Sequence, residues 1–396
     1  MTHLKRRMLF GTVLTVLVVM VLAAWFYVPT RNALQRAESF QFRRMLVTQA
    51  DNETYRFFYI TNRILGPSDE RLEDRFRNER GEELKFGFFD TNIEPTLGIG
   101  MIINPSEWFQ DEEIRIPKVQ VLEQAAFVDQ LRKQVQASPY GSLLINVNGF
   151  RERFPSALRK TAFLGHVLDI NTPILVFDWP GDQGSTPRGY RRAQRVAKAS
   201  GEDLAQALEL IIHKVQPERL WLVANSMGGQ VVVDAFSVLY QEADLADAET
   251  EIEDVVLTAP DVDRNEFNRQ FKKEITALAR NLTVYVSSND RALLMSRIVN
   301  RGRRLGESTV DTLNPDQFEE AASVLQLIEP DSTLITLVDV TPINRTRNFH
   351  NFNLETPEFF DDLYLRLTNA DTPRSRLQYQ IHMPDDRVYW VLTRGR

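Results

Sequence analysis

The stretch LWLVANSMGG, residues 220–229, decides the fold class that we expect for this chain. Its first five residues are apolar and predict a buried β-strand, and the amphipathic residues after it predict a helix. Between them, Ala224 and Gly228 stand two positions before and two positions after Ser226. So tight a strand-to-helix turn needs small residues at both places, and it lifts the central hydroxyl above the carboxyl end of the strand. The stretch predicts a nucleophile at Ser226; the alternative is that small residues only let strand and helix pack closely.

The same alternation of short β-branched runs and longer amphipathic segments continues from Ser142 onward. It is typical of a parallel sheet wrapped by helices, because each connection is long enough for a right-handed crossover. The expected strands are Leu143–Val147, Ile174–Phe177, Leu220–Ala224, Asp254–Thr258, Leu282–Ser287 and Thr333–Val338. The expected helices are Pro155–Leu168, Gly189–Lys214, Gln230–Glu242, Asn265–Arg280, Ala292–Asn300 and Pro315–Ile328. The fold class is therefore α/β, with a mostly parallel central sheet and helices on both faces.

The residues before Ser142 are less regular. They include a strand-like run at Tyr55–Ile60 and a charged stretch at Ser68–Glu83, which we expect to be a loop. No low-complexity linker separates them from the rest of the chain. We therefore expect residues 31–141 to be an extension packed on a core of residues 142–396, which ends in a hairpin.

A serine nucleophile needs a general base, and the base needs an acid that orients it. On a sheet with this turn, the partners follow the serine in the order acid, then histidine, so only His350 and His382 are eligible bases. His350 follows the last expected core strand through a loop, where the base belongs. His382 lies in the alternating tail, where a half-buried strand residue is the simpler interpretation. His350 is the expected base.

Three aspartates are candidates for the acid. Asp290 follows the strand Leu282–Ser287, one strand before the histidine, which is the usual position. Asp261 and Asp263 follow the preceding strand, where some lipases carry the acid. Asp290 is the preferred candidate, although an aspartate just before the helix from Ala292 also suits a helix cap.

Two backbone amides are candidates for an oxyanion hole. The amide of Met227, at the start of the helix after the nucleophile, points to the place where an oxyanion would form. The second donor should come from a loop after an early strand, and Asn148-Gly149-Phe150 follows Leu143–Val147. Gly149 would let the backbone approach closely, so that the Phe150 amide faces the Met227 amide. The alternative is an ordinary Asn-Gly turn.

At this point the chain resembles the α/β-hydrolases, and within them a bacterial group of esterase- or lipase-like proteins of unknown function. By this resemblance, Ser226, Asp290 and His350 take the roles of nucleophile, acid and base. Two residues depart from the pattern, because Asn148 and Asn225 stand where the group usually has histidines. The matching motifs are FYITNR at 58–63, NGF at 148–150, FDWP at 177–180, ANSMG at 224–228, APDVD at 259–263, YVSSNDRALLMS at 285–296 and Phe349-His350.

Composition limits the possible partners. The chain has 396 residues, and its 47 basic and 54 acidic residues give a net charge of −7, so it has no basic excess for binding nucleic acid. It has no cysteine, no two histidines at metal-ligand spacing and no calcium-loop pattern. We therefore expect no metal, no cofactor and no nucleic acid.

A membrane segment is expected at the amino terminus. Residues 8–30 carry no charge and are long enough to cross a hydrocarbon layer of about 30 Å. Lys5, Arg6 and Arg7 precede this segment, which favours a single-pass anchor with the amino terminus in the cytoplasm and the remaining chain exported. The alternative is a signal peptide cut near Ala23 or Ala24, which would release a secreted protein. We expect residues 1–30 to be this anchor or signal segment, ahead of the fold.

The sequence supports two functions. The first is a membrane-anchored serine hydrolase that cleaves the carboxylic ester of a small molecule or lipid through an acyl-enzyme intermediate. The second is a catalytically silent α/β-hydrolase fold that serves as a binding module of the cell envelope, because a fold does not determine a function. The complete set of triad candidates favours the first.

Overall fold

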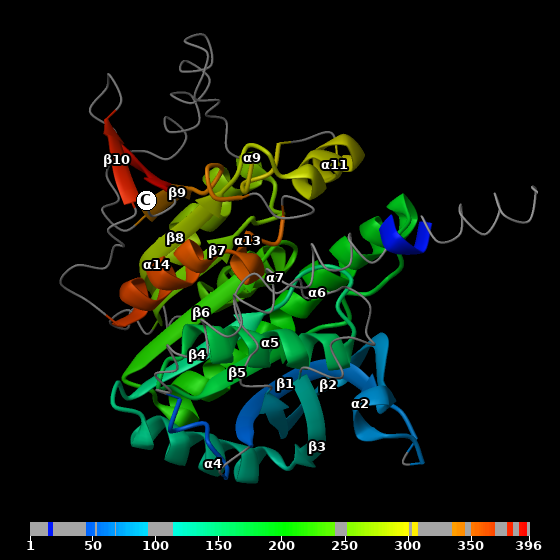
Figure 1. The fold of residues 1–396 in the computed structure, drawn as a ribbon. Helices are drawn as coiled ribbons and strands as arrows, with labels where there is room; N and C mark the ends of the chain where they lie inside the picture. Colours follow the sequence, from blue (N-terminus) through cyan, green and yellow to red (C-terminus); the bar gives the residue numbers. More distant parts are fainter. Residues whose placement is uncertain are drawn as a thin grey trace, which may run out of the picture.

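The structure of the chain is a computed structural model, drawn in Figure 1. It describes residues 15–18, 45–51, 54–67, 69–93, 114–241, 252–300, 303–307, 335–344, 350–368, 378–382 and 388–393.

The described strands form one sheet. In chain order they are β1 (Tyr55–Leu65), β2 (Phe76–Ile93), β3 (Ile114–Leu122), β4 (Ser142–Val147), β5 (Ile174–Asp178), β6 (Arg219–Asn225), β7 (Ile252–Thr258), β8 (Ala279–Val286), β9 (Ile335–Asp339), β10 (Gln378–His382) and β11 (Val388–Leu392). Their order across the sheet is β10-β11-β9-β8-β7-β6-β4-β5-β1-β2-β3. The strands from β11 to β1 in this order pair in parallel, while the β1/β2, β2/β3 and β10/β11 pairs are antiparallel.

Helices cover both faces of this sheet, as Figure 1 shows. They are α2 (Leu72–Arg75), α4 (Gln124–Ala137), α5 (Phe154–Leu168), α6 (Pro187–Leu210), α7 (Gly228–Leu239), α9 (Arg264–Glu266), α10 (Lys272–Leu278), α11 (Arg291–Asn300), α13 (Phe352–Glu355) and α14 (Pro357–Thr368). One apolar core contains side chains of α4, α6, α7 and α10, and a second contains side chains of α5, α13 and α14. With apolar layers on both faces, the central strands are continuous apolar runs rather than alternating ones; β4 is buried along its whole length.

The predicted fold class is confirmed. Each of the six expected core strands lies within a few residues of an observed one, and the expected tail hairpin is the β10/β11 pair. The expected helix Pro315–Ile328 lies outside the described residues. The loop expected at Ser68–Glu83 is wrong, because this stretch contains α2 and the first half of β2. Its charged side chains are accommodated because that half of β2 is largely exposed, while its backbone still pairs with β1.

The membrane segment expected at residues 8–30 lies outside the described residues, apart from one helical turn at 15–18. Among the described residues, none of the helices is both long enough and apolar enough to cross a bilayer.

Candidate active site

The turn after β6 has the geometry that its small residues predict. Ser226 has φ +53°, in the left-handed region that a non-glycine residue rarely adopts. Its amide donates to the carbonyl of Thr258 at 2.9 Å, and its carbonyl accepts from the amides of Asp261 and Gly229, each at 3.0 Å. Two backbone hydrogen bonds to the end of β7 and the segment after it, and one from the first turn of α7, therefore hold this strained residue between β6 and α7.

Two glycines let a second loop lie directly against this turn. A Cβ atom on Gly228 would come within 2.6 Å of the carbonyl oxygens of both Val147 and Asn148, a distance that real Cβ atoms do not show. A Cβ atom on Gly149 would lie 3.0 Å from the Cβ of Ser226. The loop after β4 and the turn after β6 are thus in direct contact.

The structure joins His350 to Asp290. The Nδ1 atom of His350 lies 2.7 Å from Oδ2 of Asp290. The other carboxylate oxygen, Oδ1, accepts from the amide of Leu293 at 3.0 Å, at the start of α11. The Asp290 side chain is fully buried and that of His350 is 14% exposed. Both roles expected for Asp290, histidine partner and helix cap, are therefore filled at once by its two oxygens.

Burial and the charge of Asp290 have opposite effects on the pKa of the His350 imidazole. Burial by itself lowers the pKa of His350, because it penalises the charged ring. The charge of Asp290 and its hydrogen bond act in the opposite direction and outweigh burial, and Asp261 adds to them. The pKa of His350 is therefore raised above its ordinary value.

The other two aspartates are engaged elsewhere. Asp261 is buried and accepts from Nε of Arg304 at 2.6 Å, from Ser296 at 2.6 Å and from the hydroxyl of Tyr190. Asp263 caps α9 by accepting from the amides of residues 265 and 266 at 3.0 Å. Within the described residues, neither carboxylate is hydrogen-bonded to His350.

Each candidate residue comes just after the carboxyl end of a parallel strand, so all of them lie at the same end of the sheet. Phe150 follows β4, Ser226 follows β6, Asp290 follows β8 and His350 follows β9. In an open α/β sheet, ligands bind at the carboxyl ends of the strands. Ser226 is 7% exposed, and within the part of the chain that the structure describes its hydroxyl makes no hydrogen bond, to His350 or to any other group. His382 lies instead on β10, which is an edge strand of the sheet and pairs with β11.

The loop that carries Phe150 is held by hydrogen bonds on both sides. The indole of Trp179 donates to the carbonyl of Asn148 at 2.8 Å, and the amide of Arg151 donates to the carbonyl of Gly181 at 3.0 Å. Among the described residues, the amides of Phe150 and Met227 donate no hydrogen bond to the protein. Both amides are thus available to an acceptor at this end of the sheet.

Arg63 is a residue of this region that the sequence analysis missed. Its side chain is fully buried and pairs with Asp178 at 2.6 Å through Nε and 3.1 Å through Nη2. Nη2 also donates to the carbonyl of Glu152 at 2.9 Å, in the loop that carries Phe150, and to the carbonyl of Trp179 at 2.7 Å, just after β5. Arg63 and Asp178 lie in the stretches 58–63 and 177–180 that carry the family resemblance. That resemblance was the signal in the sequence from which this pair could have been found.

The two asparagines that replace the family histidines have structural partners. Asn225 donates to the hydroxyl of Thr258 at 3.0 Å, and Asn148 donates to the carbonyl of Ala157 at 3.2 Å. Each amide thus links its loop to a neighbouring element. In the described part of the chain, no three His, Asp or Glu side chains gather closely enough to hold a metal ion.

Comparison with known proteins places this geometry in a family. Residues 123–362 match the family described as alpha/beta hydrolase of unknown function (DUF900). No curated protein matches the sequence.

Solved structures similar to this chain are distant from it. They include a lipase-esterase related protein from Clostridium acetobutylicum ATCC 824, with 12% identity over 47% of this chain and 94% of that one and a TM-score of 0.23. Phospholipase PlaB from Legionella pneumophila has 11% identity, covers 64% and 68% of the two chains and has a TM-score of 0.27. A putative hydrolase from Agrobacterium vitis S4 has 10% identity, coverages of 63% and 96% and a TM-score of 0.24.

The family match covers more than half of the chain, including the strands and loops that carry Ser226, Asp290 and Phe150. Together with the parallel sheet and the strained serine turn after β6, it establishes that this chain belongs to the α/β-hydrolases of unknown function.

Proposed function

We propose that this protein is a serine hydrolase that cleaves a carboxylic ester through an acyl-enzyme intermediate. The observation that carries the proposal is the 2.7 Å hydrogen bond between His350 and the buried Asp290. A buried carboxylate that holds a partly exposed imidazole, at the end of the sheet that also bears a strained serine, is the arrangement that nucleophilic catalysis needs. Ser226 is the nucleophile, His350 the general base and Asp290 the residue that orients it.

The mechanism follows from these positions. Nδ1 of His350 carries the proton that Asp290 accepts, so Nε2 has a free lone pair and takes the proton of the Ser226 hydroxyl. The serine oxygen forms a bond to the acyl carbon, and the carbonyl electrons move to its oxygen. The amides of Met227 and Phe150 stabilise this oxyanion. When the tetrahedral intermediate collapses, the bond to the alcohol breaks and His350 returns the proton to it; water then removes the acyl group by the same steps.

The test of this proposal is covalent labelling of Ser226. A fluorophosphonate forms a stable bond to a serine only where a base activates the hydroxyl. We expect one label per chain, located on Ser226 by peptide mass spectrometry and lost in Ser226→Ala. Ser288→Ala, a change at an exposed serine in the loop next to Asp290, is the matched control and should label like the unchanged protein.

The alternative remains a catalytically silent binding module. The observation that favours this alternative is that the Ser226 hydroxyl makes no hydrogen bond among the described residues. Catalytic hydrogen bonds are, however, often long when no substrate is bound. A folded protein whose Ser226 resists the fluorophosphonate at every pH between about 6 and 9, the range over which a histidine base changes charge, would support the silent module.

The reaction should depend on pH through His350. The base must be neutral, and its pKa is raised by Asp290 above the ordinary value of about 6.5. Activity is therefore low where the ring is protonated, and kcat/KM should rise with pH through an inflection above 6.5. NMR titration of the imidazole should give the same value, and Asp290→Asn should lower it. An inflection at or below 6.5 would contradict the electrostatic effect that we assign to Asp290.

The location of the enzyme is proposed from the sequence alone. The uncharged residues 8–30 would anchor the protein in the cell membrane, with the hydrolase domain exported. Such an anchor would hold the active site near a membrane surface, which suits a lipid ester as well as a small-molecule ester.

A further inference from the structure

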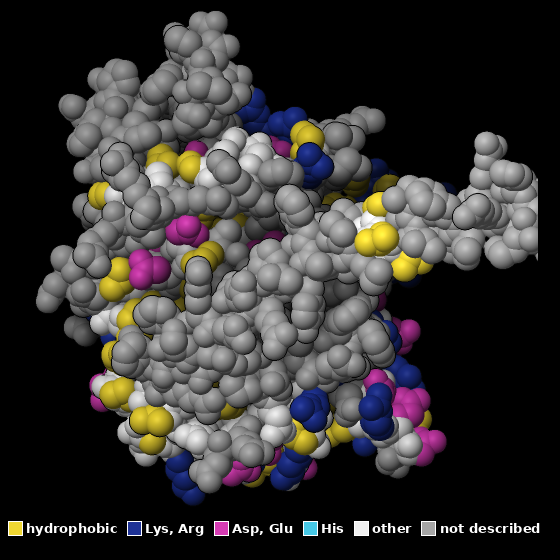
Figure 2. Space-filling model, viewed as in Figure 1, with side chains coloured by type: hydrophobic (Ala, Val, Ile, Leu, Met, Phe, Trp, Pro, Cys, Tyr) yellow, Lys and Arg dark blue, Asp and Glu magenta, His cyan; other side chains and the backbone are white. Residues whose placement is uncertain are grey.

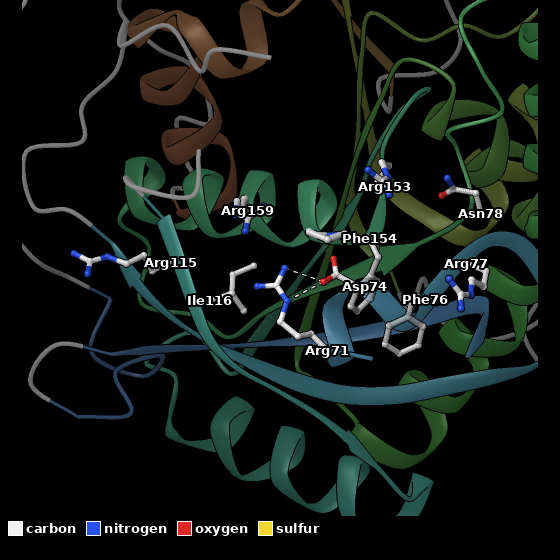
Figure 3. A pocket seen from close by; sticks show the side chains of 11 residues that line it. Arg71, Asp74, Phe76, Arg77, Asn78, Arg115, Ile116, Arg153, Phe154 and Arg159 are labelled. Atoms are coloured by element: carbon white, nitrogen blue, oxygen red, sulfur yellow. Dashed lines mark hydrogen bonds and ion pairs between the residues drawn. The ribbon is translucent and has the colours of Figure 1, made fainter. Parts of the chain in front are cut away.

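A pocket of about 480 Å³, whose lining residues do not include the serine turn, lies between α2, β2, β3 and the start of α5. Figure 3 shows the side chains that line it and the elements that carry them. Phe76 and Phe154 form an apolar part of its wall, with ring centroids 4.1 Å apart. The polar part is unusual for a chain of net charge −7, because five guanidinium groups line the pocket against one carboxylate, that of Asp74. The arginines are Arg71, Arg77, Arg115, Arg153 and Arg159.

The arginines reach the pocket from separate parts of the chain. Arg71 is bound to Asp74 at 2.8 Å, the pair joined by dashed lines in Figure 3, and Arg77 is bound to Glu70 at 2.7 Å, so two of the five guanidinium groups have a carboxylate partner. Arg115 comes from β3, and Arg153 and Arg159 come from the start of α5. Figure 2 shows basic side chains in dark blue over the lower part of the molecule, where Figure 1 places β2, β3 and α2, with acidic ones beside them. The positive charge at this pocket therefore comes from arginines that the fold brings together, and not from the net charge of the chain.

The backbone adds to the positive potential. Helix α5 has 15 residues, and its first residues, Phe154 and Pro155, line the pocket. The N-cap residue Arg153 makes no side-chain capping bond. A helix start carries partial positive charge, which adds to the field of the guanidinium groups. Guanidinium groups bind phosphate oxygens through paired, charge-assisted hydrogen bonds.

We propose that this pocket binds a phosphate group that carries two negative charges. Its volume is several times that needed for a phosphate ion alone, so the phosphate of a larger molecule also fits. Two sources share this chemistry: a free phosphate compound, or the exposed phosphate of a lipid headgroup. The proposal does not rest on the catalytic function, because it concerns binding.

The pocket is connected to the candidate active site through Arg63. Asn78 lines the pocket, and its side-chain oxygen accepts from Nη1 of Arg63 at 2.6 Å. Arg63 also bonds to the carbonyl of Glu152, the residue just before Arg153. Phe150 is three residues from Arg153, which limits the separation of their Cα atoms to about 11 Å. A phosphate in the pocket would thus lie beside the loop that carries the candidate oxyanion amide.

The experiment measures binding of three probes to the full-length chain in a neutral detergent by isothermal titration calorimetry. The probes are inorganic phosphate, a short-chain diether phosphatidate, which an esterase cannot cleave, and the diether phosphatidylcholine of the same chain length. The variant is Arg115→Gln with Arg153→Gln, both exposed, and the matched control is Arg191→Gln on the exposed face of α6. Thermal unfolding checks that the unchanged protein, the double variant and the control are all folded.

We expect phosphate or phosphatidate to bind, and the double variant to bind it about 100-fold more weakly, about 10-fold for each guanidinium removed. Arg191→Gln should bind like the unchanged protein. Tighter binding of phosphatidate than of inorganic phosphate or phosphatidylcholine would identify the lipid headgroup, and equal binding of phosphate and phosphatidate would identify a free phosphate compound. No binding of either, or equal weakening by Arg191→Gln, would overturn the proposal.

Discussion

Ser226→Ala and His350→Ala are each expected to lower kcat on a short p-nitrophenyl ester by about 10⁴ to 10⁶, and the double variant to lose little more. The reason is that the two residues act as a unit: without the base the serine is a poor nucleophile, and without the serine the base has nothing to activate. The measurement is kcat for both single variants and for the double variant, with folding checked by circular dichroism.

Two other histidines serve as controls for this result. His213 is exposed and lies between α6 and β6, before the amino end of β6, whereas Ser226 follows its carboxyl end. His213→Ala should therefore keep full activity. His382→Ala tests the other eligible base and should also remain near the unchanged protein. If His382→Ala loses the activity while His350→Ala keeps it, or if the losses of Ser226→Ala and His350→Ala multiply, the assignment of the base is wrong.

Asp290→Asn should lower kcat by about 10⁴. An asparagine amide can donate to Nδ1 of His350, which would place the ring proton on Nε2, and a protonated Nε2 cannot accept the serine proton. The cap of α11 should survive, because asparagine caps helices about as well as aspartate. The activity should therefore fall without a large loss of stability, and kcat together with urea unfolding separates the two effects.

The same substitution at the other candidate acids gives matched controls. Asp263→Asn keeps the cap of α9 and should leave both activity and stability near the unchanged protein. Asp261→Asn leaves the buried Arg304 without its charge partner and should lower the free energy of unfolding by about 3 to 5 kcal/mol. A loss of 10⁴ in Asp263→Asn, or unchanged kcat in Asp290→Asn, would contradict our choice of acid.

The residues of the serine turn could be placed from the sequence because their constraints are local. The backbone of Ser226 turns directly from β6 into α7, so the need for small neighbours acts over a few residues. The order of the strands that follow then limited the eligible histidines to His350 and His382. No local pattern, however, distinguished the three aspartates, since each of them follows a strand.

The choice among these aspartates depends on distant residues. Asp261 is bound by Arg304, 43 positions away, whereas Asp290 meets His350, 60 positions away. Which carboxylate faces an arginine and which faces a histidine is decided by how the segments after β7, β8 and β9 pack. The sequence could rank these residues only by analogy, because side-chain contacts between loops leave no periodic pattern.

By itself, the sequence determined the parallel core, since strands buried on both faces must be apolar throughout and the helices around them must be amphipathic. Only the tertiary structure decided that the charged residues from Phe76 to Glu83 form half of a strand, because their pairing with β1 supplies backbone hydrogen bonds that composition does not reveal. It alone decided that Arg63 is fully buried. A buried guanidinium is stable only where a carboxylate and carbonyl groups meet it, and here Asp178, 115 positions away, and two carbonyls do so.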